Sequence, residues 1–498
     1  MKRAIKIEKI LLMTPPYMAK GITPHPQMGL ACVGAYLENL GYEVKIVDAM
    51  ASGWTRSGST GWDNKYIGLS FEEIKEEIRS FKPQVIGVHN NFTSQHRMPG
   101  LVFQAAKEVD EAIVTVTGGA HASVCTELCL QDKNLDFVVI GEGELPFGQL
   151  LEHLKGDKPI HEVAGIAYRN NGSTVIVPQR EWISDLDRLP FPARHLLDFD
   201  LYWRLGFSHG KRPGKRFTPV ITSRGCPCNC AFCTYHRVSG KKFRPRSPES
   251  VIAELKLLKD KYKVDEITFE DDNLTLDPKR AARIFDMMIA EGLGFRWEVP
   301  NGVAAFTLSR EIIKKMKDSG CYRINFAIES GSQYVLDNII RKPLDLEKVP
   351  DLVEYCREIG IEPNIFLLIG TPGETKEQMW ESFRFAEKIK VYHPFISTCM
   401  PLVGSEAYRI CEQNNYFDPG FSLDSLNLEY PCFSTPQISS KELYKMKKAG
   451  ERYLAAKAIL AHPFDPHEWI SMAAKCLPDP VKRLIVSTVR FLFSRKSV

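Results

Sequence analysis

The sequence predicts an α/β protein: an N-terminal doubly wound parallel sheet of the flavodoxin-like type, a partial (β/α)6 barrel, and a helical C-terminal region. Short apolar runs alternate with amphipathic stretches up to about residue 155. The alternation resumes after a proline-rich stretch and continues to about residue 405, beyond which the patterns are helical. Strands that alternate with helices are typical of parallel sheets covered by helices.

The composition is that of a globular chain with more than one domain. At 498 residues the chain exceeds one typical domain, and 44% hydrophobic and 25% charged residues are ordinary values for a soluble protein. A net charge of +4 is too small to indicate a nucleic-acid partner, and thirteen cysteines in this length fit a reducing compartment rather than a disulfide scaffold. Because we find no signal-peptide pattern and no apolar stretch of membrane-spanning length, we expect a cytoplasmic protein.

The first domain, residues 1–155, has apolar runs that we assign as parallel strands at 10–14, 44–47, 85–88, 113–117 and 137–140. Ligands bind such sheets beyond the carboxyl ends of the strands, where glycines let the backbone approach them closely. The candidate ligand residues in these loops are Thr93, Gly118, Gly119, His121, Gly141, Glu142, Gly143 and Glu144. The alternative is a flavodoxin-like sheet whose glycines only make tight turns.

Residues 156–205 are assigned as a linker, and residues 206–405 as the barrel. Candidate barrel strands lie at 217–223, 266–270, 295–299, 323–328, 364–369 and 395–400. Sites in such barrels form where the strands end. Glu270 and Asp271 follow the second strand, Glu329 and Ser330 the fourth, and Gly370 the fifth, so we expect them at one mouth. Taken singly, each acid is also explained as a helix cap or a solvated charge.

The loop after the first barrel strand contains Cys226, Cys230 and Cys233 in the spacing C-x3-C-x2-C. Three thiolates this close suit an iron–sulfur cube that leaves one iron without a protein ligand. The alternatives are ordinary buried cysteines or part of a zinc site, since His236 is near. Cys228 breaks the spacing and is not assigned as a ligand.

Together these motifs resemble the cobalamin-dependent radical S-adenosylmethionine (radical SAM) enzymes, a group of methylases and anaerobic protoporphyrin ester cyclases. The cysteine spacing, with Phe232 before the last cysteine, resembles the radical SAM signature, and the Gly-Gly-x-His-Ala-Ser and Gly-Glu-Gly-Glu segments resemble the cobalamin domain. The resemblance spans residues 8–405. No D-x-H-x-x-G motif is present, so it implies cobalamin bound with its own base displaced and no histidine on cobalt.

The resemblance also implies residue roles. The three cysteines would hold a [4Fe-4S] cluster, and the first-domain loop residues given above would bind cobalamin. S-adenosylmethionine would contact Phe232, Glu270, Asp271, Glu329, Ser330 and Gly370. The implied reaction is methylation of an unactivated carbon through a 5′-deoxyadenosyl radical and methylcobalamin, with an electron donor such as flavodoxin or ferredoxin.

Three alternatives stay open at this point. One is a cyclase or rearrangement enzyme acting on a tetrapyrrole or lipid-like substrate, and another is a non-catalytic corrinoid-binding sensor. The third, a tRNA methylthiotransferase, would normally show a further cysteine trio, and Cys32, Cys125 and Cys129 lack the spacing for it.

The C-terminal region, residues 406–498, ends in a basic amphipathic segment at 479–498. Such a helix lies on an anionic membrane surface or docks on the protein with its basic face in water. The first alternative predicts peripheral membrane contact and slightly favours a lipid-like or tetrapyrrole substrate.

Overall fold

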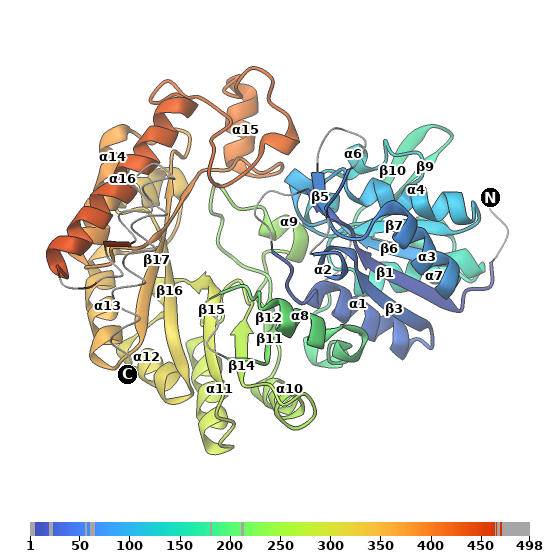
Figure 1. The fold of residues 1–498 in the computed structure, drawn as a ribbon, viewed down its shortest axis with the longest axis horizontal. Helices are drawn as coiled ribbons and strands as arrows, with labels where there is room; N and C mark the ends of the chain where they lie inside the picture. Colours follow the sequence, from blue (N-terminus) through green and yellow to red (C-terminus); the bar gives the residue numbers. More distant parts are fainter. Residues whose placement is uncertain are drawn as a thin grey trace.

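The computed structural model describes residues 5–18, 23–54, 57–59, 65–179, 182–210, 214–463, 465 and 469–470. It has two lobes, each built on its own parallel sheet, and the C-terminal region crosses from the second lobe toward the first (Figure 1). The predicted basic segment, 479–498, lies outside the described residues.

The first sheet has the strand order β10-β9-β8-β7-β6-β1-β3. Its parallel strands are β1 (Lys9–Thr14), β3 (Glu43–Asp48), β6 (Val85–His89), β7 (Val114–Gly118) and β8 (Phe137–Val139). Strand β1 pairs with β3 on one side and β6 on the other, so the order reverses there. A crevice at such a reversal is the usual ligand site of this type of sheet.

Helices cover both faces of this sheet, as predicted. Leu11 and Met13 of β1 pack toward α3 (Phe71–Phe81) and α4 (Pro99–Val109), while Ile10 and Leu12 pack toward α1 (Met28–Asn39) and α7 (Glu144–Lys155). Alternate side chains of a strand point to opposite faces, which explains the continuous apolar runs. A capping box between Ser70 and Glu73 starts α3.

Two antiparallel strands, β9 (Ile166–Asn170) and β10 (Ser173–Val177), extend the sheet into the stretch that the sequence assigned to a linker. They form a hairpin whose turn residues, Asn171 and Gly172, both have positive φ. Asn-Gly is a strong signal for such a turn. Strand β10 is mostly exposed although Val175, Ile176 and Val177 are apolar, and the linker prediction missed this run.

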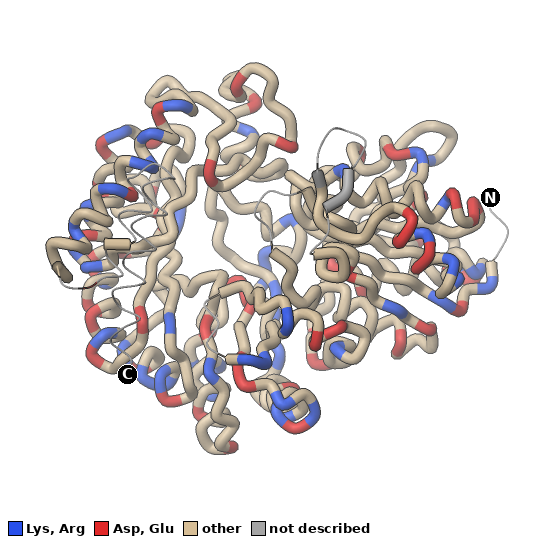
Figure 2. Tube along the Cα trace, in the orientation of Figure 1, with Lys and Arg blue, Asp and Glu red and all other residues tan. Residues whose placement is uncertain are grey.

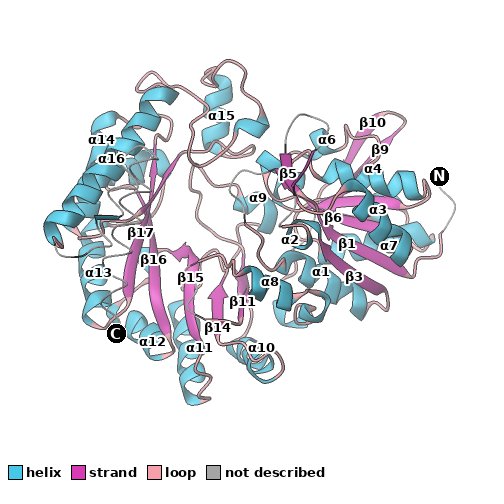
Figure 3. Cartoon of the chain, viewed as in Figure 1, coloured by secondary structure: helices cyan, strands magenta, loops and turns pink. Residues whose placement is uncertain are grey.

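The second sheet has six parallel strands in chain order, as the barrel prediction requires. They are β11 (Phe217–Val220), β14 (Glu266–Phe269), β15 (Arg296–Val303), β16 (Cys321–Glu329), β17 (Glu362–Ile369) and β18 (Phe395–Thr398). The helices α10 (Pro248–Asp260), α11 (Pro278–Ala290), α12 (Arg310–Asp318), α13 (Val349–Glu358) and α14 (Lys376–Lys388) line its outer face (Figure 3). The sheet is a partial barrel, open between β11 and β18.

The C-terminal region contains α15 (Glu406–Gln413) and α16 (Ser440–Ala461), and α16 packs on α14. It also reaches the first domain, where Arg97 Nε lies 3.1 Å from Asp424 Oδ2. Among the described residues, no helix is long and apolar enough to cross a membrane. Acidic and basic residues are interspersed over the outer helices of both lobes (Figure 2).

The remaining elements are short. They are β2 (Tyr17–Met18), α2 (Ala49–Ser52), β4 (Ser57–Ser59), β5 (Lys65–Ile67), α5 (Ala120–Val124), α6 (Thr126–Cys129), α8 (Phe199–Leu205), β12 (Ser223–Arg224), α9 (Tyr235–Ser239) and β13 (Arg244–Pro245). Helices α5 and α9 pack together and join the lobes.

Candidate functional site

The cysteine loop, residues 225–243, leaves β12 and returns to β13, and these two strands pair as a small hairpin. Gly225 has φ +83°, and a Cβ there would lie 2.2 Å from Lys242 O, so the start of the loop requires glycine. Halfway along, the Ala231 N–H donates to Ile340 O and the Ala231 carbonyl accepts from Ala407 N, both at 2.9 Å. The loop is therefore held by the barrel and by α15.

The three predicted ligand cysteines are half-buried on this loop. Hydrogen bonding with Cys228 lowers the pKa of Cys226 to about 6, while burial raises that of Cys233 to about 11. Among the described residues, no three His, Cys, Asp or Glu side chains are already gathered at metal-binding geometry. Three thiols on one loop are nevertheless the donor set that an iron–sulfur cube takes, and the Lys342 ammonium favours the charged form of Cys226 and Cys230.

Asp271 lies beneath the loop. It is fully buried, and its Oδ1 accepts a 2.7 Å hydrogen bond from Thr222 Oγ1 and another from Ser223 Oγ. Burial raises its pKa. These contacts hold the strand that leads into the cysteines, which gives no support to the prediction that Asp271 contacts S-adenosylmethionine.

Glu270 does face the space between the lobes. Its Oε2 lies 2.8 Å from His209 Nδ1 and accepts from Asn301 Nδ2 at 3.1 Å, and Thr268 Oγ1 donates to its Oε1. The hydrogen bond from Glu270 raises the pKa of His209. Sequence reasoning missed His209, because it lies 61 positions from Glu270 and belongs to no motif.

Glu329 ends β16 with φ +67°, an unusual backbone conformation for a residue with a side chain. Its carboxylate forms a 2.9 Å ion pair with the buried Lys342, which follows the next helical turn. The pair lies beside the cysteine loop, since Lys342 also interacts electrostatically with Cys230. Glu329 therefore lies next to the cysteine loop, and its predicted contact with S-adenosylmethionine stays a prediction.

The other predicted S-adenosylmethionine residues have structural contacts. Ser330 is buried, and its Oγ accepts from Ser332 N at 3.1 Å. Gly370 has φ +79° and donates its N–H to Glu374 Oε2 at 2.6 Å. Phe232 packs against an apolar group of the C-terminal region that includes Phe433. Their predicted contacts with S-adenosylmethionine stay predictions.

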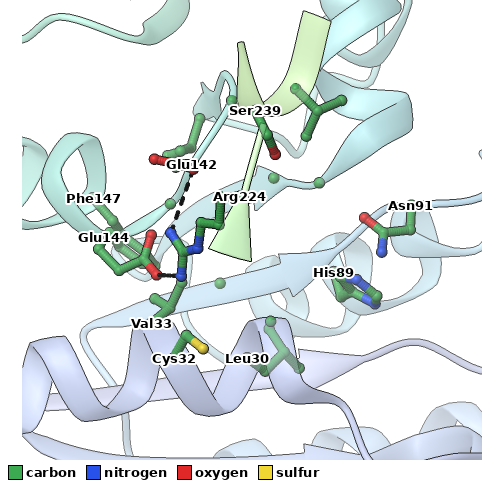
Figure 4. A pocket seen from close by; sticks show the side chains of 18 of the residues that line it. Leu30, Cys32, Val33, His89, Asn91, Glu142, Glu144, Phe147, Arg224 and Ser239 are labelled. Carbon is green, nitrogen blue, oxygen red and sulfur yellow. Dashed lines mark hydrogen bonds and ion pairs between the residues drawn. The ribbon is translucent and has the colours of Figure 1, made fainter. Parts of the chain in front are cut away.

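A cavity of about 400 Å³ lies between the two lobes (Figure 4). Its first-domain wall includes Leu30, His89 and Asn91, and its barrel wall includes Ile221, Arg224, Tyr235, Glu270 and Asp272. It begins at the carboxyl ends of β6, β7 and β8 and meets the second barrel strand. The ligand edges of both sheets therefore share one cavity.

The first-domain part of the cavity is an apolar slot that depends on glycine. A Cβ on Gly87 would lie 2.8 Å from Leu12 Cδ2 and 2.9 Å from Phe147, and a Cβ on Gly143 would lie 2.8 Å from Val33 Cγ2. Side chains at these positions would fill the slot. Its lining by Leu12, Val116, Val139 and Phe147 suits a flat, largely apolar ring, such as the displaced base of a cobalamin.

The predicted cobalamin residues divide into three groups. Gly118, Gly119, Gly141 and Gly143 line the cavity. Glu142 and Glu144 also line it, but their carboxylates bind Arg244 and Arg224 of the barrel domain at 2.6 Å. Thr93 and His121 are not among the residues that line it. They contact each other, with His121 Nδ1 3.2 Å from Thr93 Oγ1. Burial lowers the pKa of His121 to about 3.

Comparison with known proteins identifies two domains. Residues 16–151 match the B12 binding domain, and residues 220–386 match the radical SAM superfamily. The cytidylyl-2-hydroxyethylphosphonate methyltransferase of Streptomyces wedmorensis is 34% identical, covering 82% of each chain. An uncharacterized methyltransferase of Pyrococcus horikoshii is 30% identical over 94% of this chain and 97% of its own. The anaerobic magnesium-protoporphyrin IX monomethyl ester cyclase of Rubrivivax gelatinosus is 25% identical over 92% of this chain and 79% of its own.

Solved structures share the architecture. The radical S-adenosylmethionine methyltransferase TsrM from Kitasatospora setae, with cobalamin and a [4Fe-4S] cluster bound, superposes with a TM-score of 0.72 over 98% of this chain and 100% of its own. The cobalamin-dependent enzyme OxsB gives 0.70 over 97% of this chain and 70% of its own. Both are 15% identical, so they confirm the predicted fold and no more.

Proposed function

The chain belongs to the radical SAM superfamily, in the group that joins the barrel to a B12 binding domain, and we propose that it is a cobalamin-dependent methyltransferase that acts on carbon. Its cofactors are accordingly a [4Fe-4S] cluster, S-adenosylmethionine and cobalamin. Two methyltransferases at 30% and 34% identity favour methyl transfer over ring closure, for which the ester cyclase relative at 25% is the precedent.

The shared cavity is the observation that carries this proposal. Methyl transfer to a carbon radical requires both reactive groups to reach the same substrate atom. In this chain the glycine-rich edge of β7 and β8 and the carboxylates that follow β14 line one cavity of about 400 Å³. A corrinoid sensor would have no need for such a junction.

When bound, the cofactors supply a carbon-centred radical and a transferable methyl group. Cys226, Cys230 and Cys233 would hold the cluster, and the Lys342 ammonium offsets the thiolate charge. Glu270, held by His209 and Asn301, would accept a hydrogen bond from the S-adenosylmethionine ammonium. The apolar slot would exclude water from the part of a cobalamin that it holds.

Several finer proposals follow from the sequence. We propose a small-molecule substrate and a one-electron donor such as flavodoxin or ferredoxin. We place the first domain at residues 1–177, since β10 belongs to its sheet, and keep the barrel at 206–405. Membrane contact through residues 479–498 stays a prediction that liposome flotation of the full chain and of a chain lacking them would test.

Anaerobic turnover of the reconstituted enzyme tests the function. We expect 5′-deoxyadenosine and S-adenosylhomocysteine in comparable amounts, together with a product heavier by one methyl group in extracts of the source cells. Cyclisation would give 5′-deoxyadenosine without stoichiometric S-adenosylhomocysteine. Absence of both nucleoside products from enzyme with a full iron–sulfur complement would refute radical chemistry altogether.

A further inference from the structure

We propose that a buried ion-pair network, formed by Glu142, Glu144, Arg224 and Arg244, sets the position of the cysteine loop against the first domain and so couples radical formation to methyl transfer. This inference rests on the proposed function, because the coupling is measured as the ratio of 5′-deoxyadenosine to methylated product. The four side chains act through the loop and the cavity wall, so they are positioning residues.

The contacts are short and shielded from solvent. Arg244 donates from Nη1 to Glu142 Oε2 at 2.8 Å and from Nη2 to Oε1 at 2.6 Å, and both side chains are at most 5% exposed. Arg224 Nη2 donates to Glu144 Oε1 at 2.6 Å, with Glu144 only 3% exposed. Arg224 Nη1 also lies 3.6 Å from Glu142 Oε1, which joins the two pairs into one network (Figure 4).

The two arginines stand at the base of the cysteine loop. Arg224 and Arg244 are cross-strand partners in the β12–β13 hairpin, and Arg224 is two positions before Cys226. Arg244 further donates to Ile183 O and Ser239 O, at 2.8 and 2.7 Å, and its guanidinium lies over the Trp182 ring. A shift of either arginine therefore moves the hairpin from which the loop with the first ligand cysteine starts.

The two glutamates stand at the ligand edge of the first domain. They follow β8 and open α7, within the glycine-rich segment that lines the cavity. Both Glu142 oxygens accept hydrogen bonds from Arg244 of the barrel domain. The acids of this motif thus hold the two domains together, whereas its glycines shape the slot.

Paired charges fix the position of one domain against another better than apolar contacts do. Bidentate Arg–carboxylate pairs are directional and fix orientation, whereas apolar surfaces can slide. Charges taken out of water add little net stability, and apolar residues of similar volume often replace them without loss. This contrast allows positioning and stability to be separated experimentally.

The experiment compares Arg224→Met, the double variant Arg224→Met/Glu144→Leu, and a control, Arg283→Met/Glu249→Leu, which removes an exposed ion pair between α10 and α11. Each full-length protein is reconstituted with cluster and cobalamin. The measurements are the unfolding midpoint, the amide hydrogen exchange of residues 223–245, and the ratio of 5′-deoxyadenosine to methylated product.

We expect Arg224→Met to lower the unfolding midpoint and the double variant to recover it. Both variants should show at least about fivefold faster exchange in residues 223–245 and at least about a fivefold higher nucleoside-to-product ratio, compared at equal cluster and cobalamin content, with the control unchanged. Recovery of slow exchange and of the ratio in the double variant would overturn the proposal, because the pair would then contribute stability alone. If the wild type yields no methylated product, the proposed function fails, and the exchange measurement still decides whether the network positions the loop.

Discussion

The ligand edges of the two sheets are made of different chemistry, although both lie at the carboxyl ends of parallel strands. The first-domain edge is lined by glycines and aliphatic side chains around an apolar slot. The barrel mouth carries ionisable groups, such as the Glu329–Lys342 pair and the pair of half-buried Glu270 with the exposed His209. The same topological position thus suits a large, mostly apolar ring in one lobe and a small zwitterion in the other, because the loops rather than the sheets set the polarity.

Removing a ligand cysteine should have the largest effect, and only on the barrel side. Cys233→Ala is expected to lower the bound iron by about tenfold or more and to abolish 5′-deoxyadenosine formation, because an iron–sulfur cube with one open iron needs all three thiolates. Cys228→Ala is the matched control and should keep its iron. Iron and sulfide analysis with paramagnetic resonance measures the outcome, and cobalamin content should not change. An iron-free Cys228→Ala protein would contradict the ligand assignment.

Breaking the charged pair at the barrel mouth should have the next largest effect. In Lys342→Met the Glu329 carboxylate, 13% exposed, loses its cation, and we expect a loss of about 3 kcal/mol in the free energy of unfolding. Lys342→Met/Glu329→Leu should recover most of it, because no unpaired charge is left. Denaturant unfolding of the cofactor-free protein measures both. Equal stability of the single and double variants would contradict this expectation, because it would show that water at the barrel mouth solvates the unpaired Glu329 carboxylate.

Filling the slot tests the first-domain edge. A Cβ on Gly118 would meet Val139 at an ordinary 3.5 Å, so Gly118→Leu is compatible with the backbone while its side chain enters the cavity. Overpacking by about one to three kcal/mol predicts cobalamin binding weaker by about 5- to 150-fold. Ala112→Leu, exposed before β7, is the control. Spectroscopic titration measures the affinity of each variant for cobalamin. An unchanged affinity in Gly118→Leu would show that cobalamin does not bind in the slot.

The smallest effect concerns an acid of the first domain that pairs with no cation in the described part of the chain. Asp48, at the end of β3, accepts from Tyr202 Oη at 2.6 Å and from Ala51 N, and burial raises its pKa to about 6. The folded protein therefore binds the Asp48 proton more tightly than the unfolded chain does. The stability that this proton contributes is complete below about pH 4 and is lost as the pH rises to about 6.

We therefore expect Asp48→Asn to be more stable than the wild type above pH 6 by about 2 kcal/mol, with the advantage vanishing toward pH 4. The exposed Asp260→Asn is the control. Unfolding free energies measured between pH 4 and 8 test the prediction, which a pH-independent difference would exclude.

Sequence patterns were sufficient to predict those features that depend on residues close together in the chain. Five parallel strands of the first sheet and six of the second follow from apolar runs, since a strand buried on both faces is apolar throughout. The cysteine spacing is local in the same sense, as eight consecutive residues carry it. The β9–β10 hairpin also had a local signal, Asn171-Gly172 followed by the apolar run Val175–Val177, and the linker prediction missed it.

The roles of the acidic residues were not accessible in this way. Glu142, Glu144 and Asp271 occur in segments that the sequence placed correctly at strand ends, yet their partners lie 102, 80 and 49 positions away along the chain. A carboxylate at a strand end has the same sequence signature whether it holds a ligand, a domain or a loop.

By itself, therefore, the sequence determined the two parallel sheets, the order of the domains and the thiols of the cysteine loop, because periodicity and short spacings act over a few residues. Only the tertiary structure decided which acids face the shared cavity, which pair with Arg224 and Arg244, and that His209 joins Glu270. Those outcomes depend on how two separately folded surfaces meet, and the desolvation of a charge at such a junction is set by its neighbours in space.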